Sequence, residues 1–172
     1  MGFLLLAPFF LVRFGLLSAL SPTAVRRAAH FAPLSESEKP AYWLYQLSTA
    51  AIVVSLLFLK IKLTPTWLFC AGLAVYLVGL LLLIVSVVNF AAPAENGFNQ
   101  NGLYRFSRNP MYAAYFLFFL GCALTTRSPL LLGLVLLFQI TAHWIILAEE
   151  RWCAGKFGPA YLRYKEKVRR YL

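Results

Sequence analysis

Apolar runs long enough to cross a lipid bilayer dominate this sequence and restrict what it can fold into. The clearest run, 67–88, contains no charged residue. A membrane-spanning helix needs roughly 20 mostly apolar residues. Hydrophobic residues make up 61% of the 172 residues, well above the share that a soluble domain carries. The sequence therefore predicts an all-α fold, a polytopic membrane helical bundle. The five expected spans are 3–20, 41–59, 67–88, 111–126 and 129–148.

Positive charge is distributed unevenly among the segments that connect these runs. Twelve of the 16 Lys and Arg residues lie in 21–40, 89–110 and the tail 149–172. The two other connections carry three, and Arg13 lies inside the first run. Cytoplasmic loops of membrane proteins are enriched in Lys and Arg. The pattern predicts an integral membrane protein with its N-terminus outside and its C-terminus in the cytoplasm.

The net charge of +10 raises the question of an anionic partner. The basic residues flank apolar runs, so lipid headgroups explain the charge and we expect no nucleic-acid partner. The three cysteines have neither metal nor redox spacing, and we expect no metal site. Three small residues of the third run are suited to close helix packing, either within one chain or in an oligomer. They are Gly72, Ala74 and Gly79.

The C-terminal tail alternates aromatic and basic residues. Its apolar positions Tyr161, Tyr164, Val168 and Tyr171 recur at helical spacing with cations between them. This pattern predicts an interfacial amphipathic helix on the membrane surface. For the last few residues, a solvated basic tail is an equal alternative. We expect one domain over 1–172, in which 1–88 supplies spans and 89–172 carries the site.

The connecting segment 89–110 is rich in amides and contains two glycines, two arginines and a proline at its end. Gly97 and Gly102 permit sharp turns and close approach of the backbone to a ligand. Pro110 is suited to the first turn of a helix, so the fourth span is expected to begin there. A helix N-terminus binds anions readily, and Arg108 beside it indicates an anion site.

The end of the fifth run carries a second polar group of residues. Gln139, His143 and Glu150 fall along one face of a helix with 3.6 residues per turn,. Glu149 and Glu150 lie at the expected cytoplasmic end, where acidic residues do not help to anchor a helix. Polar groups at membrane depth usually face the protein interior or a wet cavity. We interpret the acidic pair as functional, and His143 as either a packing residue or a proton relay.

The stretches "GLYRFSRNPMYAAY" and "EERWCAGKFGPAYLRYKEKV" together resemble the C-terminal signature of the isoprenylcysteine carboxyl methyltransferase and phospholipid methyltransferase superfamily. The resemblance covers roughly residues 98–168. The matching positions are Gly102, Tyr104, Arg108, Asn109, Pro110, Tyr112, Glu149, Glu150, Phe157, Gly158, Tyr161 and Tyr164.

The resemblance implies a membrane-embedded enzyme that uses S-adenosylmethionine and a lipid or lipid-linked methyl acceptor. It implies that Arg108 binds an anionic group and that Glu150, with Glu149, binds the cofactor or accepts a proton. The sequence itself offers His143 as a candidate proton relay. The cofactor-binding residues implied are Gly102, Tyr104, Arg108, Asn109, Pro110, Tyr112, Glu149 and Glu150.

The sequence leaves other interpretations of the function open. The sequence departs from the superfamily pattern at Asn109, where many members have His, and at Arg169, where Pro is usual. The acceptor is either an isoprenylcysteine-like carboxylate or a phospholipid amine headgroup. Membrane sterol reductases that use NADPH share a similar C-terminal pattern, including a Cys where Cys153 stands. A non-enzymatic membrane scaffold would explain the spans but not two polar segments on one side of the membrane.

Overall fold

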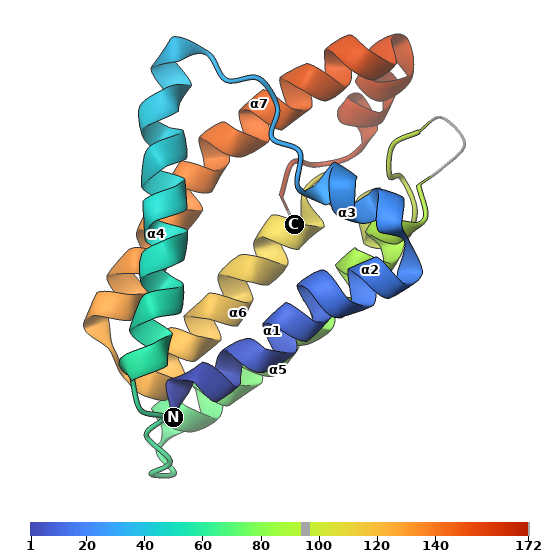
Figure 1. The fold of residues 1–172 in the computed structure, drawn as a ribbon. Helices are drawn as coiled ribbons and strands as arrows, with labels where there is room; N and C mark the ends of the chain where they lie inside the picture. The colour runs from blue at the N-terminus through green and yellow to red at the C-terminus, as the bar shows by residue number, and fades with distance from the viewer. Residues whose placement is uncertain (94–96, 172) are drawn as a thin grey trace.

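The computed structural model describes residues 1–93 and 97–171, so Asn96 of the amide-rich segment lies outside the described residues. Every extended regular element in the described part is a helix (Figure 1). The first four helical segments follow one another without a break over Gly2–Leu20 and form one rod, which is called the N-terminal rod below. The bounds of the helices are η1 Gly2–Leu5, α1 Leu6–Phe10, η2 Leu11–Leu16, α2 Leu17–Leu20, α3 Pro22–Ala28, η3 Glu36–Glu38, α4 Lys39–Phe58, α5 Trp67–Ala91, η4 Gly102–Arg105, α6 Pro110–Thr126 and α7 Pro129–Lys167.

The helices confirm the predicted bundle. Among the described residues, four segments are long and apolar enough to cross a membrane, namely Gly2–Leu20, Glu36–Phe58, Trp67–Ala91 and Pro129–Lys167. α6 is apolar but has only 17 residues. At 1.5 Å per residue it is about 25 Å long, somewhat shorter than the roughly 30 Å hydrocarbon core. This agrees with the short fourth run of the sequence.

Prolines and small polar caps set several helix ends. Pro110 occupies the first turn of α6, as predicted. Ser128 accepts a hydrogen bond from the Leu131 amide and caps α7. Arg127, at φ 50°, takes the left-handed conformation that turns the chain from α6 into α7. A tight helical hairpin between the fourth and fifth runs is therefore confirmed.

Small residues bring α5 and α6 into close contact. A Cβ added at Gly79 would lie 2.4 Å from the backbone nitrogen of Phe118, and one at Gly121 would lie 2.4 Å from that of Tyr76. Gly72 likewise faces the backbone near the end of α6, whereas Ala74 is exposed. The glycines thus serve packing within one chain, which was one of the two alternatives.

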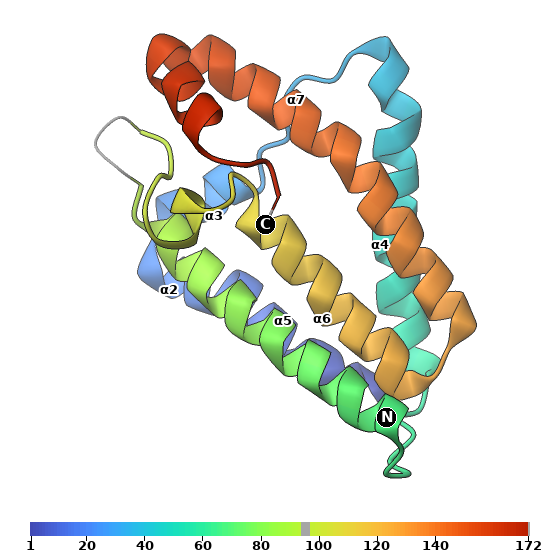
Figure 2. The same cartoon turned by 180° about the vertical axis from the view of Figure 1, so that it is seen from behind.

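The helices diverge towards one end of the bundle. α4 lies beside α7, and the N-terminal rod and α5 lie beside α6 (Figures 1 and 2). The two groups meet near the N-terminus and the α6–α7 turn, and they are widely separated at the opposite end. The segments that carry most of the positive charge, around α3, η4 and the end of α7, lie at this wide end.

The C-terminal helix differs in part from the expectation. α7 continues to Lys167 but turns sharply at Gly158, where φ is 54° and ψ is −135°. From Val168 the chain is not helical, so the predicted helical spacing does not reach Tyr171. The reason is long-range pairing, because the Arg108 amide donates a 2.8 Å hydrogen bond to the Arg169 carbonyl. Tyr161 is buried rather than turned to the surface.

Candidate functional site

A buried ion-pair network joins the start of α6 to the middle of α7. The Glu150 carboxylate lies 3.1 Å from Nη2 of Arg108 and 3.0 Å from Nη2 of Arg170. Nε of Arg170 donates a second bond, 3.1 Å long, to the same carboxylate. The side chains of Glu150 and Arg108 are only 3% and 7% exposed. Breaking a buried ion pair of this kind is strongly destabilising, because it leaves an uncompensated buried charge.

The C-terminal tail completes this network. Nδ2 of Asn109 donates to the Glu150 carboxylate at 3.4 Å and to the Arg170 carbonyl at 3.2 Å. Nη1 of Arg108 donates to the Lys165 carbonyl at 2.7 Å. The hydrogen bond to Glu150 also raises the pKa of Arg170 above its ordinary value. The tail therefore fixes the position of the segment that leads into α6.

Arg170 is a residue that the sequence reasoning missed. Its role depends on a parallel bridge between Ser107 and Arg169, two positions far apart in the chain. Two adjacent arginines in a basic tail look no different from other lysines and arginines near a membrane. No signal in the sequence distinguishes the one that contacts Glu150.

Glu149 has a different environment from Glu150. The Tyr112 hydroxyl donates a 2.8 Å hydrogen bond to Oε1 of Glu149. Within the described residues, that hydroxyl is the one side chain hydrogen-bonded to this carboxylate, and no ion pair includes it. Glu149 therefore keeps acceptor capacity for a ligand, whereas both oxygens of Glu150 are engaged.

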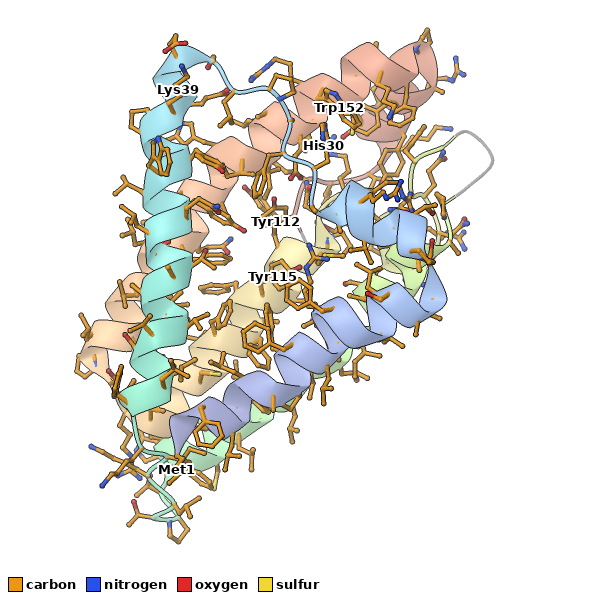
Figure 3. The ribbon with its side chains drawn as sticks, viewed as in Figure 1. Met1, His30, Lys39, Tyr112, Tyr115 and Trp152 are labelled. Atoms are coloured by element: carbon orange, nitrogen blue, oxygen red, sulfur yellow. The ribbon has the colours of Figure 1, made fainter. Side chains whose placement is uncertain are left out.

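Both carboxylates line a cavity of about 510 Å³. This is within the range of roughly 300–1,000 Å³ typical of small-molecule sites. Figure 3 shows Tyr112 and Tyr115 pointing from α6 into the space between α4 and the N-terminal helices. Many aromatic side chains line it, and they come from Phe31, Tyr45, Phe90, Phe98, Tyr104, Tyr112, Tyr115, Trp152, Phe157, Tyr161 and Tyr164.

Two polar atoms in the cavity wall are buried without a hydrogen-bond partner among the described residues. They are Nε of Arg108 and Oδ1 of Asn99. Buried polar groups in proteins are almost always hydrogen-bonded. Both residues line the cavity, so its wall contains one donor and one acceptor that no described residue satisfies.

Basic residues from the N-terminal helices form a further part of the wall. Arg13, Arg26 and Arg27 line the same cavity. Arg27 lies 4.9 Å from the centre of the Phe90 ring and donates to the Phe90 carbonyl at 2.9 Å. Burial lowers the pKa of Arg27 below its ordinary value. The sequence reasoning did not place these residues in the site, although a charge inside the first apolar run was a visible signal.

A connecting segment between α3 and η3 passes beside the cavity. The ring of His30 lies 5.0 Å from that of Trp152 (Figure 3). Farther along, Glu38 accepts two hydrogen bonds from Arg151, at 3.0 and 2.7 Å. Ser35 and Glu38 also form a capping box. These contacts join the N-terminal half of the chain to α7 near the two carboxylates.

The predicted site residues fall into three groups. Tyr104, Arg108, Asn109, Tyr112, Glu149 and Glu150 line the cavity. Gly102 and Pro110 shape its surroundings: Gly102 has φ 57°, and a Cβ there would lie 2.1 Å from Oδ1 of Asn89. His143 is outside the set of lining residues, and its Nδ1 lies 2.6 Å from the Tyr171 hydroxyl.

Comparisons with known proteins show the family of the chain. The sequence profile of a family described as "Phospholipid methyltransferase" matches residues 75–160, half of the chain. An uncharacterized protein of Haemophilus influenzae is 36% identical over 63 residues, which are 36% of this chain and 100% of that protein. No solved structure matches this chain. The profile covers the start of α6 and the two carboxylates, but not the N-terminal arginines.

Proposed function

The chain belongs to the phospholipid methyltransferase family, and we propose that it is an S-adenosylmethionine-dependent methyltransferase of the membrane that acts on a lipid or lipid-linked acceptor. The observation that carries the proposal is the meeting of two distant segments at one cavity. Arg108 and Tyr112 come from the start of α6, and Glu149 and Glu150 come from α7.

The cavity wall fits the chemistry of the cofactor. S-adenosylmethionine carries a carboxylate, an ammonium group, ribose hydroxyls and an adenine ring. Arg108 Nε and Asn99 Oδ1 supply an unused donor and an unused acceptor. Glu149 supplies a carboxylate with free acceptor capacity, and the aromatic wall is suited to stack on adenine. Bound there, S-adenosylmethionine would supply a methyl group activated by the positive charge on its sulfur.

The roles of the acidic residues follow from their partners. Glu150 holds Arg108 and Arg170 and so positions the donor groups of the wall. Glu149, oriented by Tyr112, faces the ligand. This reassigns the acid–base role that the sequence reasoning gave to Glu150. His143 has no direct role in the proposed chemistry, because its ring binds Tyr171.

The wall contributes mainly by positioning the reactants and excluding water. Methyl transfer from the bound cofactor would break the carbon–sulfur bond as the acceptor bonds to the methyl carbon, and the electron pair would stay on sulfur. A carboxylate acceptor forms a carbon–oxygen bond and loses no proton. An amine acceptor forms a carbon–nitrogen bond and must lose a proton, which Glu149 accepts.

The membrane orientation is part of the proposal. The cavity lies at the wide end of the bundle with the basic segments, and the positive-inside rule assigns this end to the cytoplasm. Single cysteines at Lys62 and Lys165, in a variant without native cysteines, test this assignment. A membrane-impermeant thiol reagent applied to intact cells should label position 62 and leave position 165 unlabelled; the reverse pattern contradicts it.

Ligand-dependent stabilisation tests the cofactor. A ligand that binds only the folded state raises the unfolding temperature. We expect S-adenosylhomocysteine to stabilise the purified protein and NADPH to have no effect. Stabilisation by NADPH alone would support the reductase alternative, and stabilisation by neither would support a scaffold. Transfer of a labelled methyl group into a membrane lipid extract would then identify the acceptor.

A further inference from the structure

Arg13 is a charged residue within an otherwise apolar membrane segment. It lies in η2, near the middle of Gly2–Leu20, and no other residue of that segment is charged. Ionisable residues inside membrane segments are costly and usually face a partner or a polar cavity. Arg13 lines the cavity described above. A charged residue at this position therefore indicates that Arg13 binds a partner in the cavity.

The protein satisfies the Arg13 guanidinium only in part. Nη2 donates a 2.9 Å hydrogen bond to the Ala28 carbonyl. In residues 1–93 and 97–171, no ion pair includes Arg13. Arg108, by contrast, is paired with Glu150. A guanidinium has five N–H donors, so Arg13 has several left to offer a ligand.

The surroundings of Arg13 make this part of the wall distinctly cationic. Arg26 and Arg27 from α3 line the cavity as well, and both carboxylates of the cavity come from α7. The N-terminal side of the cavity is therefore purely basic, whereas the α7 side carries the acidic Glu149 together with Lys156. A ligand with an acidic group at one position and its reacting atom at another would complement both sides of the cavity. Its acidic group would lie against the arginines and its reacting atom near Glu149.

We propose that Arg13 binds the acidic group, a carboxylate or a phosphate, of the amphiphilic methyl acceptor. This rests on the proposed function, because it takes the cavity to hold the acceptor beside the cofactor. Arg13 lies outside residues 75–160, which match the family profile. It is thus a specificity residue supplied by the N-terminal half of this chain. The planar guanidinium is suited to two-point contact with either group.

Single-chain amphiphiles test the inference without knowledge of the natural acceptor. Binding of dodecyl phosphate, dodecanoate and neutral dodecylglycerol is measured by calorimetry on the full chain in a neutral detergent. We expect at least one anionic probe to bind about tenfold or more tightly than dodecylglycerol, as a charge-assisted contact requires. Tighter binding of dodecyl phosphate would identify the acidic group of the acceptor as a phosphate, and tighter binding of dodecanoate would identify it as a carboxylate. Equal binding of the two anionic probes would show that the site requires only a negative charge.

Variants assign that preference to one residue. Arg13→Gln should abolish the preference, Arg13→Lys should keep part of it, and the exposed control Arg163→Gln should keep all of it. The circular dichroism spectrum should be unchanged in all three variants, which shows that they are folded, and S-adenosylhomocysteine binding is measured alongside. Equal binding of the neutral probe, or an unchanged preference in Arg13→Gln, overturns the inference.

The same measurements separate this inference from the proposed function. If the wild type binds S-adenosylhomocysteine but shows no Arg13-dependent anion preference, the subsite is wrong and the methyltransferase proposal stands. If it shows the preference but does not bind S-adenosylhomocysteine, the anion site stands as a site of the chain. Its assignment to a methyl acceptor is then overturned together with the proposed function.

Discussion

Arg108 and Glu150 form a buried ion pair, with Nη2 of the arginine 3.1 Å from the carboxylate. The pair connects the segment before α6 to the middle of α7, and Arg170 from the tail donates to both oxygens of the same carboxylate. Three segments distant in sequence are thereby held at one wall of the cavity. The two neighbouring carboxylates consequently differ in what they are free to do.

Glu150→Gln should destabilise the protein more than Glu149→Gln. The first change leaves Arg108 buried without a countercharge, and loss of one partner of a buried pair costs about 3–5 kcal/mol. The second leaves an amide oxygen that can still accept from the Tyr112 hydroxyl, and no ion pair among the described residues depends on Glu149. In detergent, the unfolding temperature should fall by a large amount in Glu150→Gln and by a small amount in Glu149→Gln. Equal decreases would contradict the division of roles.

Tyr112→Phe should lower turnover while the protein stays folded. It removes the 2.8 Å hydrogen bond that orients Glu149, and loss of one such bond costs about 1 kcal/mol of stability. Methyl transfer into lipid extract and the unfolding temperature should be measured together. Tyr42→Phe, outside the cavity wall, is the matched control and should behave as the wild type. Unchanged turnover in Tyr112→Phe would remove Tyr112 from the proposed site.

Truncation after Val168 should weaken S-adenosylhomocysteine binding. It deletes the Arg169 carbonyl that accepts from the Arg108 amide and the Arg170 guanidinium that pairs with Glu150. The segment before α6 then loses its bridge partner Arg169. Calorimetric titration should show an affinity reduced about tenfold or more, as expected for loss of a charged hydrogen-bonded partner. Wild-type affinity after truncation would show that the tail does not organise the site.

Gly79→Ala should destabilise the bundle, and Gly133→Ala should not. A Cβ at Gly79 meets the Phe118 backbone at 2.4 Å, whereas one at Gly133 meets nothing within 4 Å. An extra methyl group forced into a packed helix interface lowers the free energy of unfolding by about 1–3 kcal/mol. Alanine in place of glycine at an open helix position raises it by up to about 1 kcal/mol. Unfolding temperatures of the two variants should move in opposite directions. If both unfolding temperatures moved in the same direction, the result would contradict close packing of α5 against α6.

Much of the architecture and part of the site can be predicted from local features. Pro110 marks the start of α6 because its fixed φ suits a first helical turn. The acidic pair stands out because carboxylates at the end of an apolar run have no role as membrane anchors. Arg108 is recognised by its motif, but its pairing with Glu150 is not, since an ion pair between distant helices depends on how they pack.

The sequence by itself determined the membrane-spanning character, the approximate spans and the two segments that carry polar chemistry. These depend on run length, composition and local backbone preference, which act over a few neighbouring residues. Only the tertiary structure decided that Arg170 and Arg13 belong with them and that Glu149, rather than Glu150, keeps a free oxygen. Hydrogen bonds and ion pairs act over about 3 Å, and residues far apart in the chain reach that distance only when the helices are packed.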